Sequence, residues 1–312
     1  MAETLLDIIQ QSINGLMYGA FYALIGIGFT LFFGVMKKFN LAYGPTIMAG
    51  IYLGLIPLYR WKAPMWVVFV TCVAGAVVLG FIVELACFRY LRKGHELAPL
   101  MTTVGMLILI QETVVIVTHA APYEYPNIFG DESLEAGPFL IRPDYLAILV
   151  SGLVFVVLLY LLVQRTAFGR AMRAIAENPA VAQLLGVSVS RMNRLTFALT
   201  SALGGATGYM VAMTFGALQP GIASWMTIKG LVVIVIGGLG SIPGAICAGL
   251  LLGVVEFQAL WFLGVGYRDI LAYLLLFAFL VLRPSGVRSR TAPNAACRGE
   301  CRSRATTCVT SR

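Results

Sequence analysis

The sequence predicts an all-helical membrane protein, a polytopic bundle of eight or nine transmembrane helices. Apolar residues make up 59% of the 312 residues and charged residues only 12%, against about 25% charged in a typical soluble domain. A helix needs about 20 largely apolar residues to cross the hydrocarbon core of a bilayer, and such stretches recur from end to end of this chain. The composition therefore argues against a soluble fold.

The predicted spans are the apolar stretches of the sequence. Their approximate bounds are 12–34, 41–58, 64–88, 98–119, 144–163, 196–216, 225–239, 241–262 and 269–282. The stretch at 225–239 is short and rich in glycine, so it forms either a full span or a broken, re-entrant segment. A full span at 225–239 gives nine transmembrane helices, and a re-entrant segment gives eight. The start, MAETLLDIIQQ, has no basic region and no small-residue cleavage site, so we expect no removable signal peptide.

The distribution of lysine and arginine predicts the orientation, because cytoplasmic loops are enriched in both. With nine spans, one side of the membrane receives Lys37, Lys38, Arg89, Arg92, Lys93, Arg165, Arg170, Arg173, Arg191, Arg194 and the seven arginines from Arg283 onward. The other side receives only Arg60, Lys62, Arg142, Lys229 and Arg268. The first side is therefore predicted to be cytoplasmic, with the N-terminus outside and the C-terminus inside.

Most of the formal net charge of +8 lies at the end of the chain. Residues 287–312 are polar and rich in Arg, Ser, Thr and Cys, and this composition predicts a disordered, basic cytoplasmic tail after a membrane domain at 1–286. The tail either has no function or is held electrostatically by anionic membrane lipid. It is not a folded basic face, so we expect no nucleic-acid binding. Its cysteines lack the spacing of a metal site.

A polar but patterned loop lies between the spans at 144–163 and 196–216. Asn178 is a good N-cap, Pro179 suits the first helical position and Gly186 suits the position after the end, so the loop predicts a short helix over 179–185. Val181, Leu184 and Leu185 fall on one side of it. Two turns of helix are not stable alone in water, so this side must pack against the bundle itself or against a partner protein.

The loop resembles the cytoplasmic coupling loop of ABC permeases, in the version found in branched-chain amino acid importers of the LivH type. The matching residues are Thr166, Gly169, Arg170, Ala171, Met172, Arg173, Ala174, Ala182 and Gly186. The general signature begins with a glutamate, where this chain has Ala180. The resemblance implies a coupling loop, 165–195, whose helix docks on an ATPase subunit. The residues implied in this coupling are Arg170, Arg173, Asn178, Pro179, Ala182, Leu184, Leu185 and Gly186.

Other segments extend the resemblance as far as Gly286. NGLMYGAFYALIGIGFTLFFGV and the following Asn40–Gly44 are similar to the family's opening helix and its Asn-Phe-Ala-His-Gly element, with Leu41 and Tyr43 as departures. GGLGSIPGAICAGLLLGVVE, residues 237–256, and the Arg283-Pro284-x-Gly286 ending also match. The resemblance implies a permease of the bacterial inner membrane that pairs with a second homologous permease, two cytoplasmic ATPase subunits and an external solute-binding protein. It binds no cofactor itself, and ATP is used by the partner subunits.

Glycines at a spacing of four predict close helix packing in the membrane. The pairs are Gly15 with Gly19, Gly50 with Gly54, Gly204 with Gly208, Gly240 with Gly244 and Gly249 with Gly253. The run from Gly237 to Gly244 also contains Gly238 and Pro243 and cannot hold a regular helix. Broken backbone of this kind is expected beside a transport pathway or a gating joint.

Ionisable residues within spans are the remaining clue. Glu112 lies deep in its span beside Gln111, where a carboxyl group either borders a pathway or links two helices by a hydrogen bond. Glu84 and Glu256 lie nearer the ends of their spans and are expected to be more easily solvated. The candidate pathway residues are Asn40, Tyr43, Gln111, Glu112, Gly237, Gly238, Gly240 and Gly244.

No pattern in the sequence predicts an enzyme. The chain contains neither a Gly-Lys pair, which a Walker A motif requires, nor an HExxH zinc motif. His95 and His119 have no neighbouring nucleophile or ligand in the sequence that would give them a catalytic role. The alternatives that remain are an ion-coupled secondary transporter or channel that uses Glu112 and works without an ATPase, and an intramembrane lipid-modifying enzyme.

Overall fold

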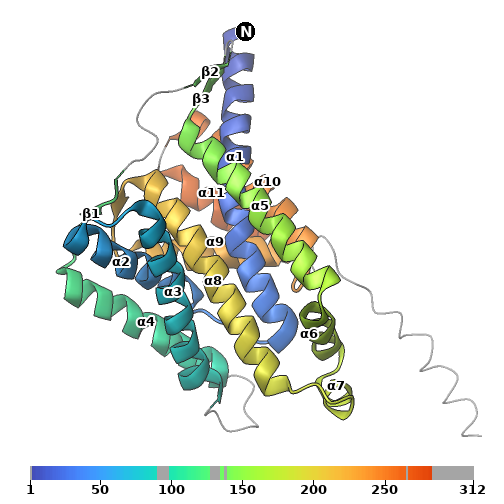
Figure 1. Ribbon diagram of the computed structural model, residues 1–312. Helices are drawn as coiled ribbons and strands as arrows, with labels where there is room; N and C mark the ends of the chain where they lie inside the picture. Colours follow the sequence, from blue (N-terminus) through green and yellow to red (C-terminus); the bar gives the residue numbers. More distant parts are fainter. Residues whose placement is uncertain (1, 90–97, 127–133, 137–138, 265, 283–312) are drawn as a thin grey trace, which may run out of the picture.

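The computed structural model describes residues 2–89, 98–126, 134–136, 139–264 and 266–282, and most of them are helical (Figure 1). The helices are α1 (Ala2–Met36), α2 (Tyr43–Trp61), α3 (Met65–Glu84) with a π-helical turn η1 (Leu85–Arg89), α4 (Ala98–Thr118), α5 (Pro143–Arg165), α6 (Ala167–Glu177), α7 (Pro179–Leu184), α8 (Val189–Phe215), α9 (Ile222–Gly237), α10 (Ile242–Leu263) and α11 (Tyr267–Leu282). The predicted tail lies outside the described residues.

Each predicted apolar stretch falls on a helix, which confirms the polytopic helical class. In the described residues, six helices are long and apolar enough to cross a membrane: α1, α3 with η1, α4, α5, α8 and α10. The stretch expected to be short, 225–239, forms α9, an apolar helix of 16 residues. The first stretch, 12–34, lies within α1, and that helix extends beyond it at both ends, from Ala2 to Met36.

α1 lies at the centre of the bundle and packs against α10, α8, α5 and α9. Two of the predicted glycine pairs form its contact with α10. A Cβ atom at Gly19 would lie 2.8 Å from the Cα of Leu250, and one at Gly249 would lie 2.4 Å from the backbone nitrogen of Ala23. Since the glycines let the two backbones approach this closely, the first and eighth predicted spans become neighbours.

The other glycine pairs divide into two kinds. Gly50 and Gly54 bring α2 against α3 near Cys72, and Gly204 and Gly208 bring α8 against the aliphatic and aromatic side chains of α2. These contacts confirm the expected close packing. Gly240 and Gly244 do not form such a helix pair, because Gly240 lies in the turn between α9 and α10.

Two short ribbons complete the described chain. β1 (Tyr123–Glu124) pairs with β4 (Ala217–Leu218), and β2 (Leu134–Ala136) pairs with β3 (Phe139–Ile141), both antiparallel. β2 and β3 lie near the N-terminal end of α1, whereas α6 and α7 lie at the opposite end of the bundle (Figure 1). The arginine-rich loop and the N-terminus are therefore at opposite ends, as the predicted topology requires.

Candidate functional site

The loop between α5 and α8 is an ordered pair of short helices. Its first helix, α6, is amphipathic and buries Met172 and Ile175. The Thr166 hydroxyl caps α6 by accepting a hydrogen bond from the Gly169 amide at 3.1 Å. The Arg173 guanidinium donates to the Val163 carbonyl oxygen and, at 3.2 Å, to Gln164 Oε1. These bonds hold α6 against the end of α5.

The second helix, α7, confirms the short helix expected after Asn178. Asn178 Oδ1 accepts hydrogen bonds from the amides of Ala180 and Val181, at 3.0 and 3.3 Å. The helix ends at Leu184, and Gly186 just beyond it has a φ of +83°, which is readily adopted only by glycine. Both ends of α7 are therefore specified by local sequence, as predicted.

The apolar side of α7 is not covered by the described part of the chain. Ala182 is buried against the bundle, but Leu184 is 88% exposed and Leu185 is 76% exposed. Val181 is half exposed. Of the two alternatives predicted for this side, packing on the bundle is therefore not observed for the two leucines within the described residues. Arg170, on α6, is also exposed.

Asn40 and Tyr43, two of the candidate pathway residues, lie in the packed interior. Asn40 Oδ1 accepts a hydrogen bond from the Ala42 amide at 3.1 Å, which shapes the turn before α2. The Tyr43 hydroxyl donates to the Thr200 carbonyl oxygen at 3.2 Å, and the ring packs edge-on against Phe29. A Cβ atom at Gly28 would lie 2.1 Å from the Tyr43 hydroxyl, so that glycine makes room for the tyrosine.

The run Gly237–Gly244 is broken as expected. α9 ends at Gly237, and Gly238 and Gly240 have φ values of +91° and +85°. α10 then begins with the Ser241 hydroxyl accepting a hydrogen bond from the Gly244 amide at 3.2 Å. A Cβ atom at Gly244 would lie 1.8 Å from the Gly237 carbonyl oxygen. The glycines therefore make a tight turn that brings α9 and α10 into backbone contact.

Gln111 and Glu112 are adjacent in α4 but point in different directions. Gln111 Oε1 accepts a hydrogen bond from Ser224 Oγ at 3.0 Å, which ties α4 to the start of α9. The Glu112 side chain is exposed and has no partner within the described residues. Gln111 therefore links two helices, and Glu112 faces outward from this chain.

A buried ionic cluster joins α1, α9, α10 and α11. Lys229 forms an ion pair with Glu256 Oε1 and lies 2.9 Å from Asp269 Oδ1. Glu256 Oε2 accepts hydrogen bonds from Arg268 Nε at 3.0 Å and from the Tyr22 hydroxyl at 2.5 Å. Arg268 Nη2 also donates to the Tyr22 hydroxyl at 2.8 Å. Two cations and two carboxylates balance, so the cluster as a whole is neutral.

Aromatic rings surround the cations of this cluster. The Arg268 guanidinium lies 5.3 Å from the centre of the Tyr18 ring and 5.9 Å from that of Trp225. The Lys229 ammonium lies 5.9 Å from the same tryptophan ring. These rings add attraction for the positive charges and keep water away from them.

The structure corrects the sequence predictions about three charged residues. Lys229 was grouped with the external loop cations, but its side chain is fully buried within α9. Glu256 and Glu84 were expected to be easily solvated, yet both are buried, Glu256 completely. Lys229 and Glu256 are isolated charges of opposite sign in apolar stretches, and membrane charges must be paired. The expectation that such charges pair is the sequence signal that would have predicted a contact between Lys229 and Glu256.

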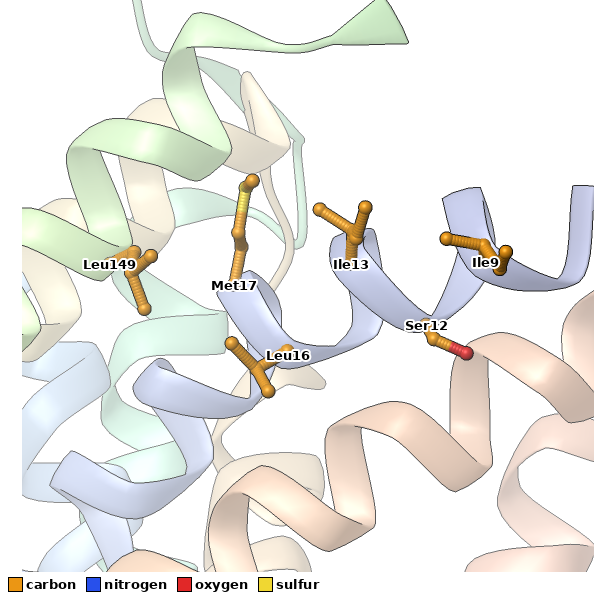
Figure 2. A pocket seen from close by; sticks show the side chains of 6 residues that line it. All are labelled: Ile9, Ser12, Ile13, Leu16, Met17 and Leu149. Carbon is orange, nitrogen blue, oxygen red and sulfur yellow. The ribbon is translucent and has the colours of Figure 1, made fainter. Parts of the chain in front are cut away.

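Two cavities border the described helices. The larger, of about 760 Å³, lies between α2, α3 and α4 and has mainly apolar walls, with Arg60, Thr113 and three tyrosines among its lining residues. The smaller, of about 410 Å³, is lined by Ile9, Ser12, Ile13, Leu16 and Met17 of α1 and by Leu149 of α5 (Figure 2). Its one polar residue, Ser12, already bonds to Ile8 and Gln258. In the described residues no group of three or more Cys, His, Asp or Glu side chains could hold a metal ion.

Comparison with known proteins places this geometry in context. The family described as branched-chain amino acid transport system / permease component matches residues 11–280. The high-affinity branched-chain amino acid transport system permease protein BraD of Pseudomonas aeruginosa is 33% identical over 90% of this chain and 96% of its own. The corresponding LivH protein of Salmonella typhimurium is 29% identical over 93% of this chain and 98% of its own.

A solved structure shows the same fold at low sequence identity. It is PsaBC from Streptococcus pneumoniae in complex with Fab, with a TM-score of 0.52 and 12% identity over 91% of this chain and 97% of that chain. The bundle described above is thus an arrangement of helices that also occurs outside the closer relatives.

Proposed function

This chain belongs to the family of branched-chain amino acid transport permeases, and from that premise we propose that it translocates a branched-chain or closely related amino acid inward across the bacterial inner membrane. It does so as the membrane-spanning subunit of an ABC importer. The relatives named above are permeases for branched-chain amino acids, and this chain is similar to them over nearly their whole length. The polytopic helical bundle is the architecture that this task needs.

The proposed complex contains other subunits that supply energy and substrate. ATP is bound and hydrolysed by two cytoplasmic ATPase subunits, the amino acid is delivered by an external solute-binding protein, and a second homologous permease completes the membrane part. In this proposal the described helices form a bundle of nine spans, counting α2, α9 and α11. The N-terminus lies outside, and the end of the bundle with α6 and α7 is cytoplasmic.

The observation that carries the proposal is the exposed apolar side of α7. A helix of six residues that is capped at both ends and presents Leu184 and Leu185 to solvent has a surface suited to another protein. Asn178 and Gly186 fix the ends of this coupling helix, and Ala182 packs it against the bundle. Arg173 anchors α6 to α5, so movement of the docked partner would be transmitted to a membrane helix. Pro179 and Arg170 complete the proposed docking surface.

The proposed pathway is bordered by α4 and by the α9–α10 turn. Glu112 presents a carboxylate outside the packed interior of this chain, and Gly237, Gly238, Gly240 and Gly244 form a compact turn next to α1. Asn40, Tyr43 and Gln111 support this region from within the bundle by their hydrogen bonds. We assign them positioning roles rather than contact with substrate.

The tail, residues 287–312, is proposed to be dispensable for transport. Its composition is polar and basic, without a pattern for a folded module. Deletion of residues 288–312 is expected to leave amino-acid uptake at the level of the full chain. Loss of uptake on deletion would show instead that the basic tail is needed, for example to hold anionic lipid.

The test of the proposed function is capture of the ATPase. The solubilised chain is purified with the products of its neighbouring genes, as wild type and with Leu184 and Leu185 changed to Asp. A Gln183→Asp variant is the control, because it places a negative charge at an exposed polar position of α7 and leaves both leucines in place. We expect an ATPase with the wild type and the control but not with the leucine variant. Absence of an ATPase from all of them would favour a transporter that works alone.

A further inference from the structure

One face of α4 has the features of a contact surface for another membrane helix. Met101, Ile108 and Ile116 on this face are 64%, 54% and 70% exposed. Glu112 lies in the same stripe, four residues from each isoleucine, and is also exposed. α4 packs chiefly against α2 and η1, so nothing described in this chain covers the stripe.

Gly105 distinguishes this face from an ordinary lipid-facing surface. No atom of the described residues lies within 4 Å of the position that a Cβ atom would occupy at Gly105, whereas every other glycine inside a described helix has a neighbouring atom within that distance. Glycine weakens a helix interior, and in membranes it is enriched where a second helix approaches closely. A position without a side chain gives no advantage in contact with lipid chains, but it lets the backbone of a second helix approach closely.

Glu112 indicates what the second helix must carry. Gly105 and Glu112 are seven residues apart, two helical turns, so one helix crossing at Gly105 can also reach the carboxylate. A carboxylate that faces lipid is costly, and such groups are normally paired with a donor or a cation, or hydrated. Within the described residues Glu112 has no such partner, and a donor or cation on a second helix at the same depth would satisfy it.

We propose that the Gly105–Glu112 face of α4 is the surface on which the second permease subunit docks, through a helix with a hydrogen-bond donor or cation at the depth of Glu112. The inference rests on the proposed function, because that function supplies the second permease. It goes further by naming the surface and the chemistry of the residue that meets it. Gly105 sets how closely the helices approach, and Glu112 sets which partner fits.

The experiment is cysteine cross-linking in membranes that contain the whole transporter. The parent chain has Ser in place of Cys247, Cys297, Cys301 and Cys308. Ile108→Cys reports on the proposed face, and Val154→Cys, on the exposed side of α5, is the matched control. A maleimide that carries a benzophenone is attached to the introduced cysteine, and on illumination it inserts into a C–H bond of the chain next to it. It is expected to join the Ile108→Cys chain, and not the control, to a second permease identified by mass spectrometry. Leu185→Cys is tested in parallel for cross-linking to the ATPase.

The outcomes separate this inference from the proposed function. A permease adduct at Ile108→Cys that falls severalfold when Gly105→Leu or Glu112→Leu is added, and persists with Glu112→Gln, supports the docking surface. No permease adduct from Ile108→Cys, while Leu185→Cys still captures the ATPase, overturns the docking surface and leaves the importer intact. An adduct unaffected by Glu112→Leu would overturn the role of the carboxylate. No ATPase adduct at Leu185→Cys would count against the proposed function itself.

Discussion

Lys229 and Glu256 form an ion pair in which neither side chain has any exposed surface. The pair lies between α9 and α10, and each member has a further partner on α11, Asp269 for the lysine and Arg268 for the glutamate. Between helices in lipid there is no hydrophobic force comparable to that in water. α11 has only one fully buried residue, Ala272. The ionic cluster is therefore a main attachment of α11 to the rest of the bundle.

The first prediction concerns this pair. Lys229→Met leaves an unbalanced carboxylate and Glu256→Gln an unbalanced cation, and removing one partner of a buried pair destabilises a protein by about 3–5 kcal/mol. The double variant restores neutrality, so its loss should be clearly smaller than the sum of the single losses. Thermal unfolding of the purified protein in detergent, followed by tryptophan fluorescence, gives the three values.

A partly exposed ion pair serves as the control. Arg142 and Asp144 lie 2.9 Å apart, but the arginine side chain is 52% exposed. Arg142→Met should lower stability by no more than about 1 kcal/mol, since exposed pairs contribute little. Additive losses in the Lys229 and Glu256 variants would mean that the two residues act independently.

The second prediction compares two glycines in helices. Gly249→Ala places a methyl group 2.4 Å from the Ala23 backbone nitrogen, so α1 and α10 must separate, and overpacking of this kind costs typically about 1–3 kcal/mol. Gly105→Ala meets no described atom within 4 Å and should stabilise the isolated permease by up to about 1 kcal/mol. The same unfolding assay measures both. Equal effects would show that the α1–α10 contact does not limit stability.

The sequence predicted the helices of the bundle and the short helix α7 well, because their signals are local. Apolar stretches long enough to span the membrane predict the long helices. The N-cap Asn178 and the glycine at 186 predict the two ends of α7. The glycine pairs also predicted close packing. They did not reveal that Gly15 and Gly19 face Gly249 and Gly253, since the order in which helices pack depends on the whole bundle.

The ionic cluster could not be predicted with the same rules. Lys229 and Glu256 are each the single charge of their helix, and Arg268 lies beside Asp269 in a third helix. The position of Glu256 near the end of its predicted span suggests a solvated side chain, but exposure depends on which face of the helix the residue occupies. The same limit applies to Glu112, whose depth was predicted and whose outward direction was not.

The third prediction compares two arginines of α6. Arg173 donates to the Val163 carbonyl oxygen in a partly buried hydrogen bond and to Gln164 in an exposed one, and a typical intramolecular hydrogen bond contributes about 1 kcal/mol. Arg173→Ala should therefore release α6 from α5, lowering both stability and transport. Arg170 is exposed, so Arg170→Ala should leave stability unchanged within about 0.5 kcal/mol. Unfolding in detergent and uptake in reconstituted vesicles distinguish the two variants.

The fourth prediction concerns the cap of α7. Asn178→Ala removes the acceptor for the Ala180 and Val181 amides, which typically lowers helix stability by about 1 kcal/mol. Because α7 has only six residues, that loss should unwind it and reduce ATPase capture about fivefold, the factor that corresponds to 1 kcal/mol. Asn178→Asp keeps an acceptor at the same position and should retain capture. Transport should fall with capture in the alanine variant, while the unfolding temperature of the membrane bundle stays near that of the wild type. If Asn178→Ala captured the ATPase normally, docking would depend on Leu184 and Leu185 alone and not on a preformed helix.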